Sequence, residues 1–317
     1  MLQVVFLWIL SRGIELGVIV LCLLPFRWFL RKTAPRFFSY MMWSALPVNV
    51  IYNILIYFEP NISTLGVSIL NKKITVGIGE TILNNGLVLY GIGTIVVLCV
   101  MGYSYIRLQR CLVGCIRLRE NIYETDRIKA PFSMGLFNPK IYLPYDMKDE
   151  YREPVVLHEQ VHIKRKDLWM KYLAVAFLGV FWFQPVLWLA YMLFINDMES
   201  ACDETVLRRS TFDMREVYAT ALVEVSYDAG NIWGAAIGYG SGELFDRVRN
   251  VMKFRKPGLS NYVKSGLLCV VVLIVALVVS KQIPLFVQRE QRSYSFEENQ
   301  LSVKTSIMST EEMVTEE

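Results

Sequence analysis

The chain has 317 residues, of which 54% are apolar and 20% are charged. Soluble proteins average about 45–50% apolar residues, so this composition is shifted towards membrane proteins. The net charge of +4 is too small to indicate a nucleic-acid-binding protein, and we expect no direct contact with nucleic acid. The six cysteines contain no CxxC pair and indicate neither a disulfide framework nor a cysteine zinc site.

Four apolar stretches are long enough to cross a bilayer, which takes about 20 apolar residues in a helix. No basic segment precedes the first stretch and no cleavage site follows it, so we predict a retained span and not a signal peptide. This stretch contains Arg12 and Glu15, which can pair on one helix face. The four predicted spans are Leu2–Leu24, Phe37–Phe58, Gly86–Ile106 and Tyr262–Ser280.

The charges between the spans predict an orientation. Phe26–Arg36 carries four basic residues and no acid, which places it on the cytoplasmic side. The loop Glu59–Asn85 and the acidic tail then fall outside, and the end of the tail, rich in Glu and Ser, is typical of disorder. We therefore predict three spans in residues 1–106, a cytoplasmic domain in 107–261, a fourth span in 262–280 and an outer tail in 281–317.

A fifth apolar run, residues 172–195, is interrupted by Gln184-Pro185. Proline breaks or kinks a helix interior, and two helices of about twelve residues would each be only about 18 Å long. We predict that this run dips into the membrane as a hairpin and returns. The stretch FSMGLFNPKIYLP, residues 132–144, alternates apolar residues around an Asn-Pro turn and predicts a short β-hairpin.

The candidate metal-binding and catalytic residues lie in VVLHEQVHIKRKDLW, residues 155–169, which holds the only two histidines of the chain. His158 and His162 lie one turn apart on the same face of a predicted helix, which is the geometry for gripping one zinc ion. Glu159 projects beside them, where it can take a proton from a water at the metal. The alternative is two solvated histidines on an exposed helix.

A catalytic zinc usually has three protein ligands, and without a third histidine we predict a carboxylate. The block NDMESACDETVL, residues 196–207, offers Glu199 and Asp203 on one helix face. We predict that Glu199 binds the metal and that Asp203 accepts a hydrogen bond from a ligand histidine; the alternative is a charged, solvated helix. We set Cys202 aside, because a helix that turns Glu199 and Asp203 inward turns it partly away. Glu199 reaches the histidines only if run 172–195 returns.

Three blocks, HEQVHIKRKDLWMKYL, FWFQPVLWLA and NDMESACDETVL, together resemble the membrane metallopeptidase domain of the BlaR/MecR type, found in bacterial β-lactam sensor-transducers and their relatives. The stretches FSMGLFNPKIYLP and LFDRVRNVMKFRKP resemble the segments before and after them. The resemblance implies a mainly α, polytopic protein of the bacterial plasma membrane, with four transmembrane helices and a cytoplasmic gluzincin-like domain containing a small hairpin or sheet. It implies zinc as the cofactor, with His158, His162 and Glu199 as ligands, Glu159 as the base and Asp203 in support.

The sensor-transducers carry a large penicillin-binding domain after their last span, whereas about 37 residues follow Ser280 here and contain no S-x-x-K motif. We therefore expect no direct sensing of β-lactams, and the cleavage of a repressor that the resemblance implies is in doubt. The leading interpretation is a regulatory zinc endopeptidase, connected with antibiotic response, that cleaves a cytoplasmic repressor or its own linker. The alternatives are a processing or quality-control zincin of the heat-shock or prenyl-protease type, and a non-catalytic membrane signalling protein. The expected partners are a protein substrate and the lipid bilayer, and a homodimer is left open.

Zinc endopeptidases commonly bind an extended substrate, whose backbone can pair with an edge strand. We predict this edge in Phe132–Leu143, with Ile141 as the candidate residue. The basic linker Ser241–Asn261 is tethered close to the site, so we predict self-cleavage there, with a fragment that ends between Gly242 and Lys256.

Overall fold

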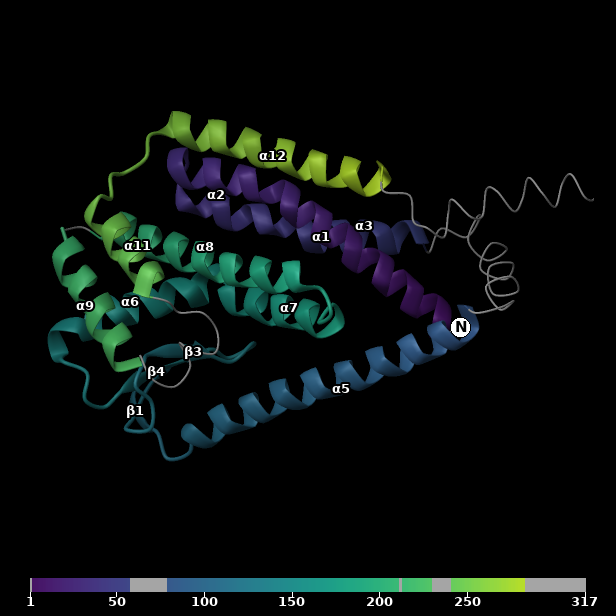
Figure 1. Cartoon of the computed structure of the whole chain (residues 1–317). Helices are drawn as coiled ribbons and strands as arrows, with labels where there is room; N and C mark the ends of the chain where they lie inside the picture. The colour runs from purple at the N-terminus through teal and green to yellow at the C-terminus, as the bar shows by residue number, and fades with distance from the viewer. Residues whose placement is uncertain (1, 58–78, 211–212, 230–240, 283–317) are drawn as a thin grey trace, which may run out of the picture.

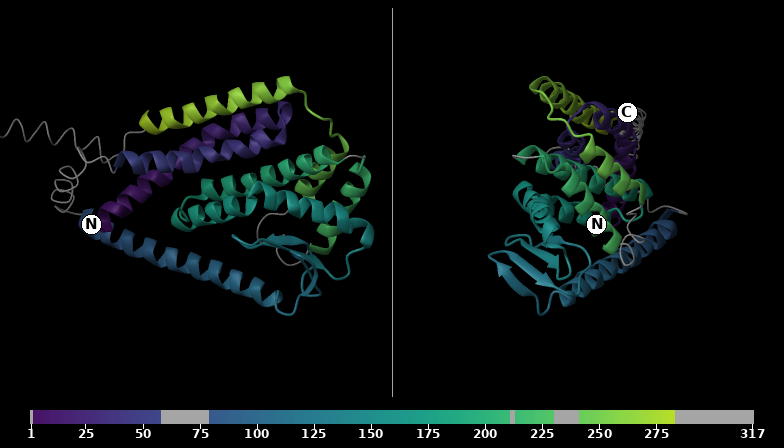
Figure 2. Two further views of the ribbon diagram at one scale, coloured as in Figure 1. Left: turned by 180° about the vertical axis from the view of Figure 1, so that it is seen from behind. Right: turned by 90° about the vertical axis from the view of Figure 1, so that its left-hand side faces the viewer.

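The computed structural model describes residues 2–57, 79–210, 213–229 and 241–282 (Figure 1). Most of the predicted outer loop Glu59–Asn85 and nearly all of the predicted tail lie outside these residues. The described chain is mainly helical and contains one small sheet, as predicted. Apolar helices form one end of the elongated body, and the sheet packs with shorter helices at the other (Figures 1 and 2).

Three of the described helices are long and apolar enough to cross a membrane. They contain three of the four predicted spans and extend beyond the predicted ends. In both views α1 and α12 lie side by side, whereas α5 runs along the opposite side of the body (Figures 1 and 2). Their bounds are Leu2–Thr33 for α1, Gly79–Cys111 for α5 and Leu259–Gln282 for α12. Inside α1, the predicted ion pair of Arg12 and Glu15 is confirmed.

The fourth predicted span is divided into three pieces. Pro47 has no N–H to offer to the carbonyl of Trp43, which favours a tighter turn at that point. None of the pieces is long enough by itself to qualify as a span, so a crossing by this stretch stays a prediction. The pieces are α2 (Arg36–Met41), the 3-10 helix η1 (Met42–Ser44) and α3 (Ala45–Tyr57).

The fifth apolar run turns back on itself. Helix α7 (Asp167–Val180) and helix α8 (Pro185–Arg209) lie side by side and are joined by a four-residue turn at 181–184 (Figures 1 and 2). The second helix is longer than predicted, because α8 continues through the block NDMESACDETVL without a break. This return brings Glu199 back to α6 (Asp149–Arg165), which carries the two histidines.

The tip of the α7–α8 hairpin lies deep against α1. Gln184 donates a hydrogen bond of 3.0 Å to the carbonyl of Gly13, and a Cβ at Gly13 would come within 2.8 Å of the Phe183 ring. Further along α8, Arg27 of α1 donates two hydrogen bonds to Asp197. A helix rises about 1.5 Å per residue, so the tip lies about 21 Å along α1 from Arg27. This depth supports the prediction that the hairpin dips into the membrane.

The sheet has four strands in the order β1-β2-β4-β3. The antiparallel pair β3 and β4 is the predicted hairpin, whereas the sequence analysis missed β1 and β2. The β2 and β4 strands are parallel, and both β3 and β4 contact α6. The bounds are Ile116–Arg119 for β1, Ile122–Thr125 for β2, Phe132–Met134 for β3 and Lys140–Pro144 for β4.

Ile141 is not on an edge of this sheet. It pairs with Ser133 of β3 on one side and with Ile122 of β2 on the other, and its N–H donates to the carbonyl of Asn121. The prediction that Ile141 lies on a substrate-binding edge is therefore wrong, because β2 covers that side of β4. Among the strands that the structure describes, β3 is the one at the edge beside the hairpin.

Two further helices, α9 (Arg215–Ala229) and α11 (Ser241–Met252), close the domain around α6 and α8. Val251 of α11 is buried in an apolar cluster with Val161, Cys202 and Tyr218. The segment predicted to be a cleavable linker is therefore half helix and part of the folded domain.

Cysteine labelling in intact cells tests whether α8 returns to the side of the membrane from which α7 starts. Glu150 and Arg209 are exposed, and the structure places them on the same side of the hairpin. In a cysteine-free chain, single cysteines at these two positions should behave alike towards a membrane-impermeant thiol reagent, and both should react after permeabilisation. Labelling of one position and not the other in intact cells would contradict the hairpin.

Candidate metal centre

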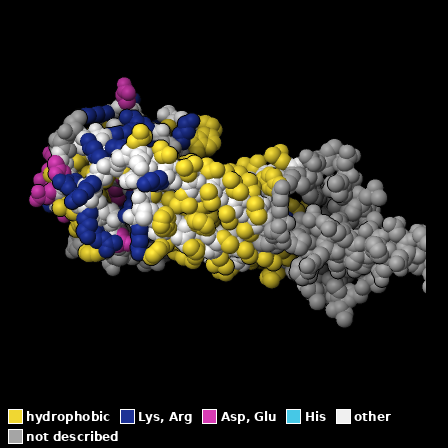
Figure 3. Space-filling model, turned by 90° about the horizontal axis from the view of Figure 1, so that it is seen from above, with side chains coloured by type: hydrophobic (Ala, Val, Ile, Leu, Met, Phe, Trp, Pro, Cys, Tyr) yellow, Lys and Arg dark blue, Asp and Glu magenta, His cyan; other side chains and the backbone are white. Residues whose placement is uncertain are grey.

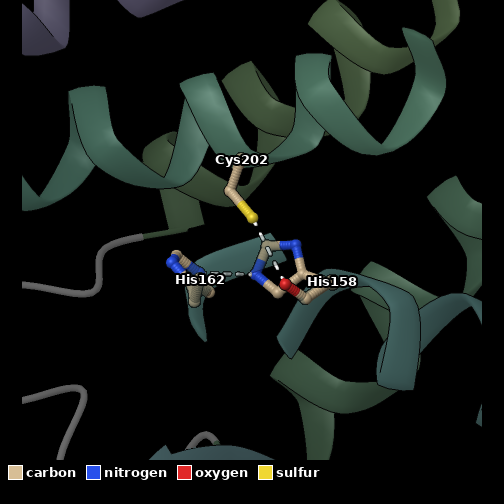
Figure 4. A group of neighbouring side chains, drawn as sticks. All are labelled: His158, His162 and Cys202. Carbon is tan, nitrogen blue, oxygen red and sulfur yellow. Dashed lines mark hydrogen bonds between the residues drawn. The ribbon is translucent and has the colours of Figure 1, made fainter. Parts of the chain in front are cut away.

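Helix α6 presents both histidines of the motif on one buried face. It begins at Asp149, earlier than the predicted start at Glu153-Pro154, and the acids of its first turn complement the helix dipole. The ring centroids of His158 and His162 are 4.7 Å apart, and their Nε2 atoms are 3.0 Å apart. Figure 4 shows the two rings directed towards one another.

Each histidine is held through its Nδ1 atom. His162 Nδ1–H donates to Asp167 at 2.8 Å. The Tyr218 hydroxyl donates to Asp203 at 2.6 Å and so accepts from His158 Nδ1–H at 2.7 Å. These bonds place the proton of each neutral ring on Nδ1 and turn both Nε2 lone pairs to the same point. Two lone pairs facing one another at 3.0 Å repel unless a cation or a proton lies between them, so the arrangement fits a metal.

Glu199 of α8 completes a triangle with the two rings. Its carboxylate oxygens lie 3.3 Å from Nε2 of His158 and 3.5 Å from Nε2 of His162. Ligand atoms bound at about 2.0–2.1 Å around a tetrahedral zinc are about 3.3–3.4 Å from one another. The structure thus brings the three predicted ligands together at separations that suit zinc. Their role as ligands stays a prediction.

Cys202 also belongs to this cluster, contrary to the expectation that α8 turns it aside. Its sulfur and the ring nitrogens of His158 and His162 all lie within 4.8 Å of one another (Figure 4). Residues three apart share a helix side, so Glu199 and Cys202 both face α6. A zinc bound by all four groups would have no open position, which is typical of structural sites. Hydrolysis therefore requires Glu199 or Cys202 to stay off the metal.

The charges in the cluster favour a cation. Burial alone would lower the pKa of both histidines, but the acidic groups of Cys202 and Glu199 outweigh it. They raise the pKa of His158 to about 10 and that of His162 well above its usual value. Burial would likewise raise the pKa of Glu199, yet the histidines and Lys171 hold it well below the usual range. A bound metal would replace the imidazole protons, so its affinity should fall as the pH falls.

Asp203 supports His158 through the hydroxyl of Tyr218 and not through the direct hydrogen bond that was predicted. Its Oδ1 atom lies 3.5 Å from His158 Nδ1, and the Tyr218 hydroxyl bridges them. Arg247 of α11 donates two hydrogen bonds of 2.8 Å to Asp203 and lies 3.5 Å from Glu199. Neither Tyr218 nor Arg247 was predicted as a site residue, because both reach the site from distant helices; Arg247 lies inside the block LFDRVRNVMKFRKP.

Asp167, in contrast, carried a signal that the sequence analysis did not use. It lies inside the motif stretch, five residues after His162. Between them Lys166 adopts a left-handed conformation, with φ of 60°, that ends α6. This sharp change of direction turns the fully buried Asp167 carboxylate back towards His162.

The fold and the site together define a membrane-associated domain with a buried cluster of side chains that could bind a metal. Comparison with known families agrees, because residues 96–251 match the family described as BlaR1 peptidase M56. Residues 96–251 are thus similar to the BlaR/MecR-type family, and the predicted resemblance is confirmed over this region. The match implies a metal cofactor of the metallopeptidase kind.

Similar curated proteins come from Staphylococcus and Bacillus species. The methicillin resistance mecR1 protein of Staphylococcus aureus strain Mu50 is 36% identical over 88 residues, 26% of this chain and 15% of the relative. The same values hold for the mecR1 protein of Staphylococcus epidermidis. The regulatory protein BlaR1 of Bacillus licheniformis is 38% identical over 85 residues, 26% of this chain and 14% of the relative. The chain thus matches about a seventh of these relatives' length, so the activity of the whole relatives is not carried over to this chain.

Removing the Tyr218 hydroxyl tests the hydrogen-bonded support of His158. In the Tyr218→Phe protein, His158 Nδ1–H and Asp203 lose their shared partner, and zinc affinity should fall about 10- to 100-fold. Competition with a chromophoric chelator measures this in detergent. Tyr145→Phe, at an exposed tyrosine, should leave the affinity unchanged. Equal affinity in the Tyr218→Phe and wild-type proteins would show that the hydroxyl does not orient the ligand.

Proposed function

We propose that this chain is a membrane-embedded zinc endopeptidase with a regulatory role. The observation that carries the proposal is the convergence of His158, His162 and Glu199 on one point beside Glu159. Similarity to a peptidase family supports it, as does the regulatory naming of the BlaR1 relative. The complete site argues against a non-catalytic signalling protein, and the family match argues against the heat-shock or prenyl-protease alternative.

His158, His162 and Glu199 would hold the zinc, with Cys202 as the alternative third ligand. When bound, zinc would supply Lewis acidity that polarises a carbonyl and lowers the pKa of water. Glu159 is buried, and within the described part of the chain its carboxylate makes no hydrogen bond or ion pair. It is therefore available to take a proton from the attacking water and to pass it to the leaving amide nitrogen.

Lys171 is the best placed group to stabilise negative charge on the substrate oxygen. Its ammonium lies 3.6 Å from Glu199, and its side chain is 36% exposed. Arg247 is closer to the protein interior, at 11% exposure, and its guanidinium is already bound by Asp203. A cation positioned beforehand beside the reacting carbonyl stabilises the oxyanion at little cost of reorganisation. We therefore assign this role to Lys171.

The substrate should be a separate protein that adds a strand to β3. Within the described residues no strand pairs with the outer side of β3, and β3 contacts α6, so a segment paired with it would run beside the motif helix. Cleavage of the chain's own linker is less favoured than the sequence suggested. Most of the predicted cut region, Gly242 to Lys256, lies in α11, and cutting there would require unwinding the helix that supplies Arg247. A cytoplasmic repressor remains the proposed substrate class.

Two matched variants on α6 test whether Glu159 is the catalytic base. Glu159→Gln should retain zinc and lose at least about 100-fold in the rate of hydrolysis of a fluorogenic casein, because only the proton acceptor is removed. Glu153→Gln, at an exposed position of α6, should keep both zinc and activity. If Glu159→Gln hydrolysed casein at the wild-type rate, the assignment of the base would fail.

Variants at Lys171 distinguish a role in stabilising the oxyanion from a role in holding the metal. Lys171→Ala should lower kcat by about 100- to 1,000-fold while zinc content stays at the wild-type level, and Lys171→Arg should recover part of the rate. Steady-state kinetics with parallel metal analysis measures both. Loss of zinc from Lys171→Ala would show instead that the lysine serves to hold Glu199.

A further inference from the structure

A second concave site lies at the end of the molecule where α1 ends and α12 begins. It has a volume of about 470 Å³. Its walls come from the last residues of α1, the start of α2, the second half of α8, the end of α11 and the connection to α12. We call it the basic hollow because six basic residues line it: Arg31, Lys32, Arg36, Lys253, Arg255 and Lys256.

The positive charge of the basic hollow is not balanced by its own acids. Among the described residues that line it, only Asp203 and Glu204 are acidic. Asp203 already binds Arg247, and Glu204 accepts the backbone N–H of Arg36 at 2.6 Å. Burial lowers the pKa of the Arg36 guanidinium, and Arg31 nearby lowers it further. The cations are therefore crowded, and an anion in the hollow would relieve them.

Three of the six cations are well suited to binding an anion. Lys253, Arg255 and Lys256 are exposed. Their side chains make no ion pair or hydrogen bond with any other residue that the structure describes. They lie on the connection between α11 and α12, which is neither helix nor strand from residue 254 to 258. An anion bound here would therefore replace water and no existing partner.

The basic hollow lies at the boundary between the apolar and the polar parts of the surface. Figure 3 shows Lys and Arg side chains gathered at one end of an apolar body. The hollow lies between the ends of α1 and α12, two of the three helices long enough to span a membrane. Trp28 is 62% exposed, and Lys32 Nζ lies 3.6 Å from the centre of its ring. Exposed tryptophan at the end of an apolar helix is typical of the lipid headgroup level.

We propose that the basic hollow binds the headgroup of an anionic phospholipid, such as a phosphatidylglycerol. Guanidinium and ammonium groups suit a phosphodiester, and basic pockets between membrane helices bind such headgroups. A free phosphate offers the same charge but has no acyl chains. Leu259 and Val263 of α12, which are 80% and 56% exposed, lie beside the hollow and give acyl chains a surface. The apolar surroundings therefore favour the lipid.

Native mass spectrometry of the full chain tests this site. The Glu159→Gln protein is used throughout, so that any cleavage of the connection cannot alter the hollow. Offered equal amounts of phosphatidylglycerol and phosphatidylcholine in neutral detergent, it should retain phosphatidylglycerol preferentially. The triple variant Lys253→Gln, Arg255→Gln, Lys256→Gln should bind it about tenfold more weakly.

A matched control removes the same charge from β1 and the connection between β2 and β3, near the end of α5. The triple variant Arg117→Gln, Arg119→Gln, Lys129→Gln should bind phosphatidylglycerol within about twofold of the parent, since diffuse surface attraction is weaker than a built site. If the hollow variant melts at a lower temperature than the parent, the single variants Arg255→Gln and Lys256→Gln provide the same comparison.

Four results would overturn the proposal. Equal retention of phosphatidylcholine would remove the preference for an anion, and equal losses in the two triple variants would show general surface attraction. Complete displacement by millimolar inorganic phosphate would make the hollow a site for free anions. Displacement by a glutamate-rich peptide would make it a docking site for an acidic protein segment.

Discussion

The rest of the structure depends on the hydrogen bonds that the buried carboxylate of Asp197 accepts. This side chain is fully buried on α8, and it receives two hydrogen bonds from Arg27, of 2.7 and 3.0 Å, and one of 2.9 Å from the indole of Trp43. A buried charge persists only when it is paired, and loss of one partner from such a pair costs about 3–5 kcal/mol. This contact fixes α8 against α1 and η1 two residues before Glu199.

The position of α8 sets both sites that we describe. From Asp197 onwards, one face of the helix turns Glu199 and Cys202 towards the histidines of α6. The same helix lines the basic hollow with Ser200, Asp203, Glu204 and Leu207. Asp203 belongs to both, since it lines the hollow and binds Tyr218 and Arg247 beside the metal centre. The apolar helices and the predicted metal ligand therefore share one rigid element, which is why the α7–α8 hairpin can bring Glu199 to the histidines.

The sequence predicted those features that depend on local spacing. The pair His158 and His162, the placement of Glu199 near them and the break at Gln184-Pro185 all follow from helix periodicity or from proline. Cys202 was set aside although residues three apart share a helix side, because its closeness to both histidines depends on how α8 packs against α6. Ile141 was misplaced because β1 and β2 are four residues each and too short to give a clear alternating pattern. Tyr218 and Arg247 could not have been predicted, since only tertiary packing brings α9 and α11 to the site.

The central claim is that two histidines and a glutamate bind zinc and leave an open position. X-ray absorption at the zinc edge measures this directly in the purified full chain. We expect only nitrogen and oxygen neighbours at about 2.0–2.1 Å, with an unchanged spectrum in the Cys202→Ala protein. A sulfur neighbour at about 2.3 Å that disappears in Cys202→Ala would place the thiolate on the metal and contradict the assignment.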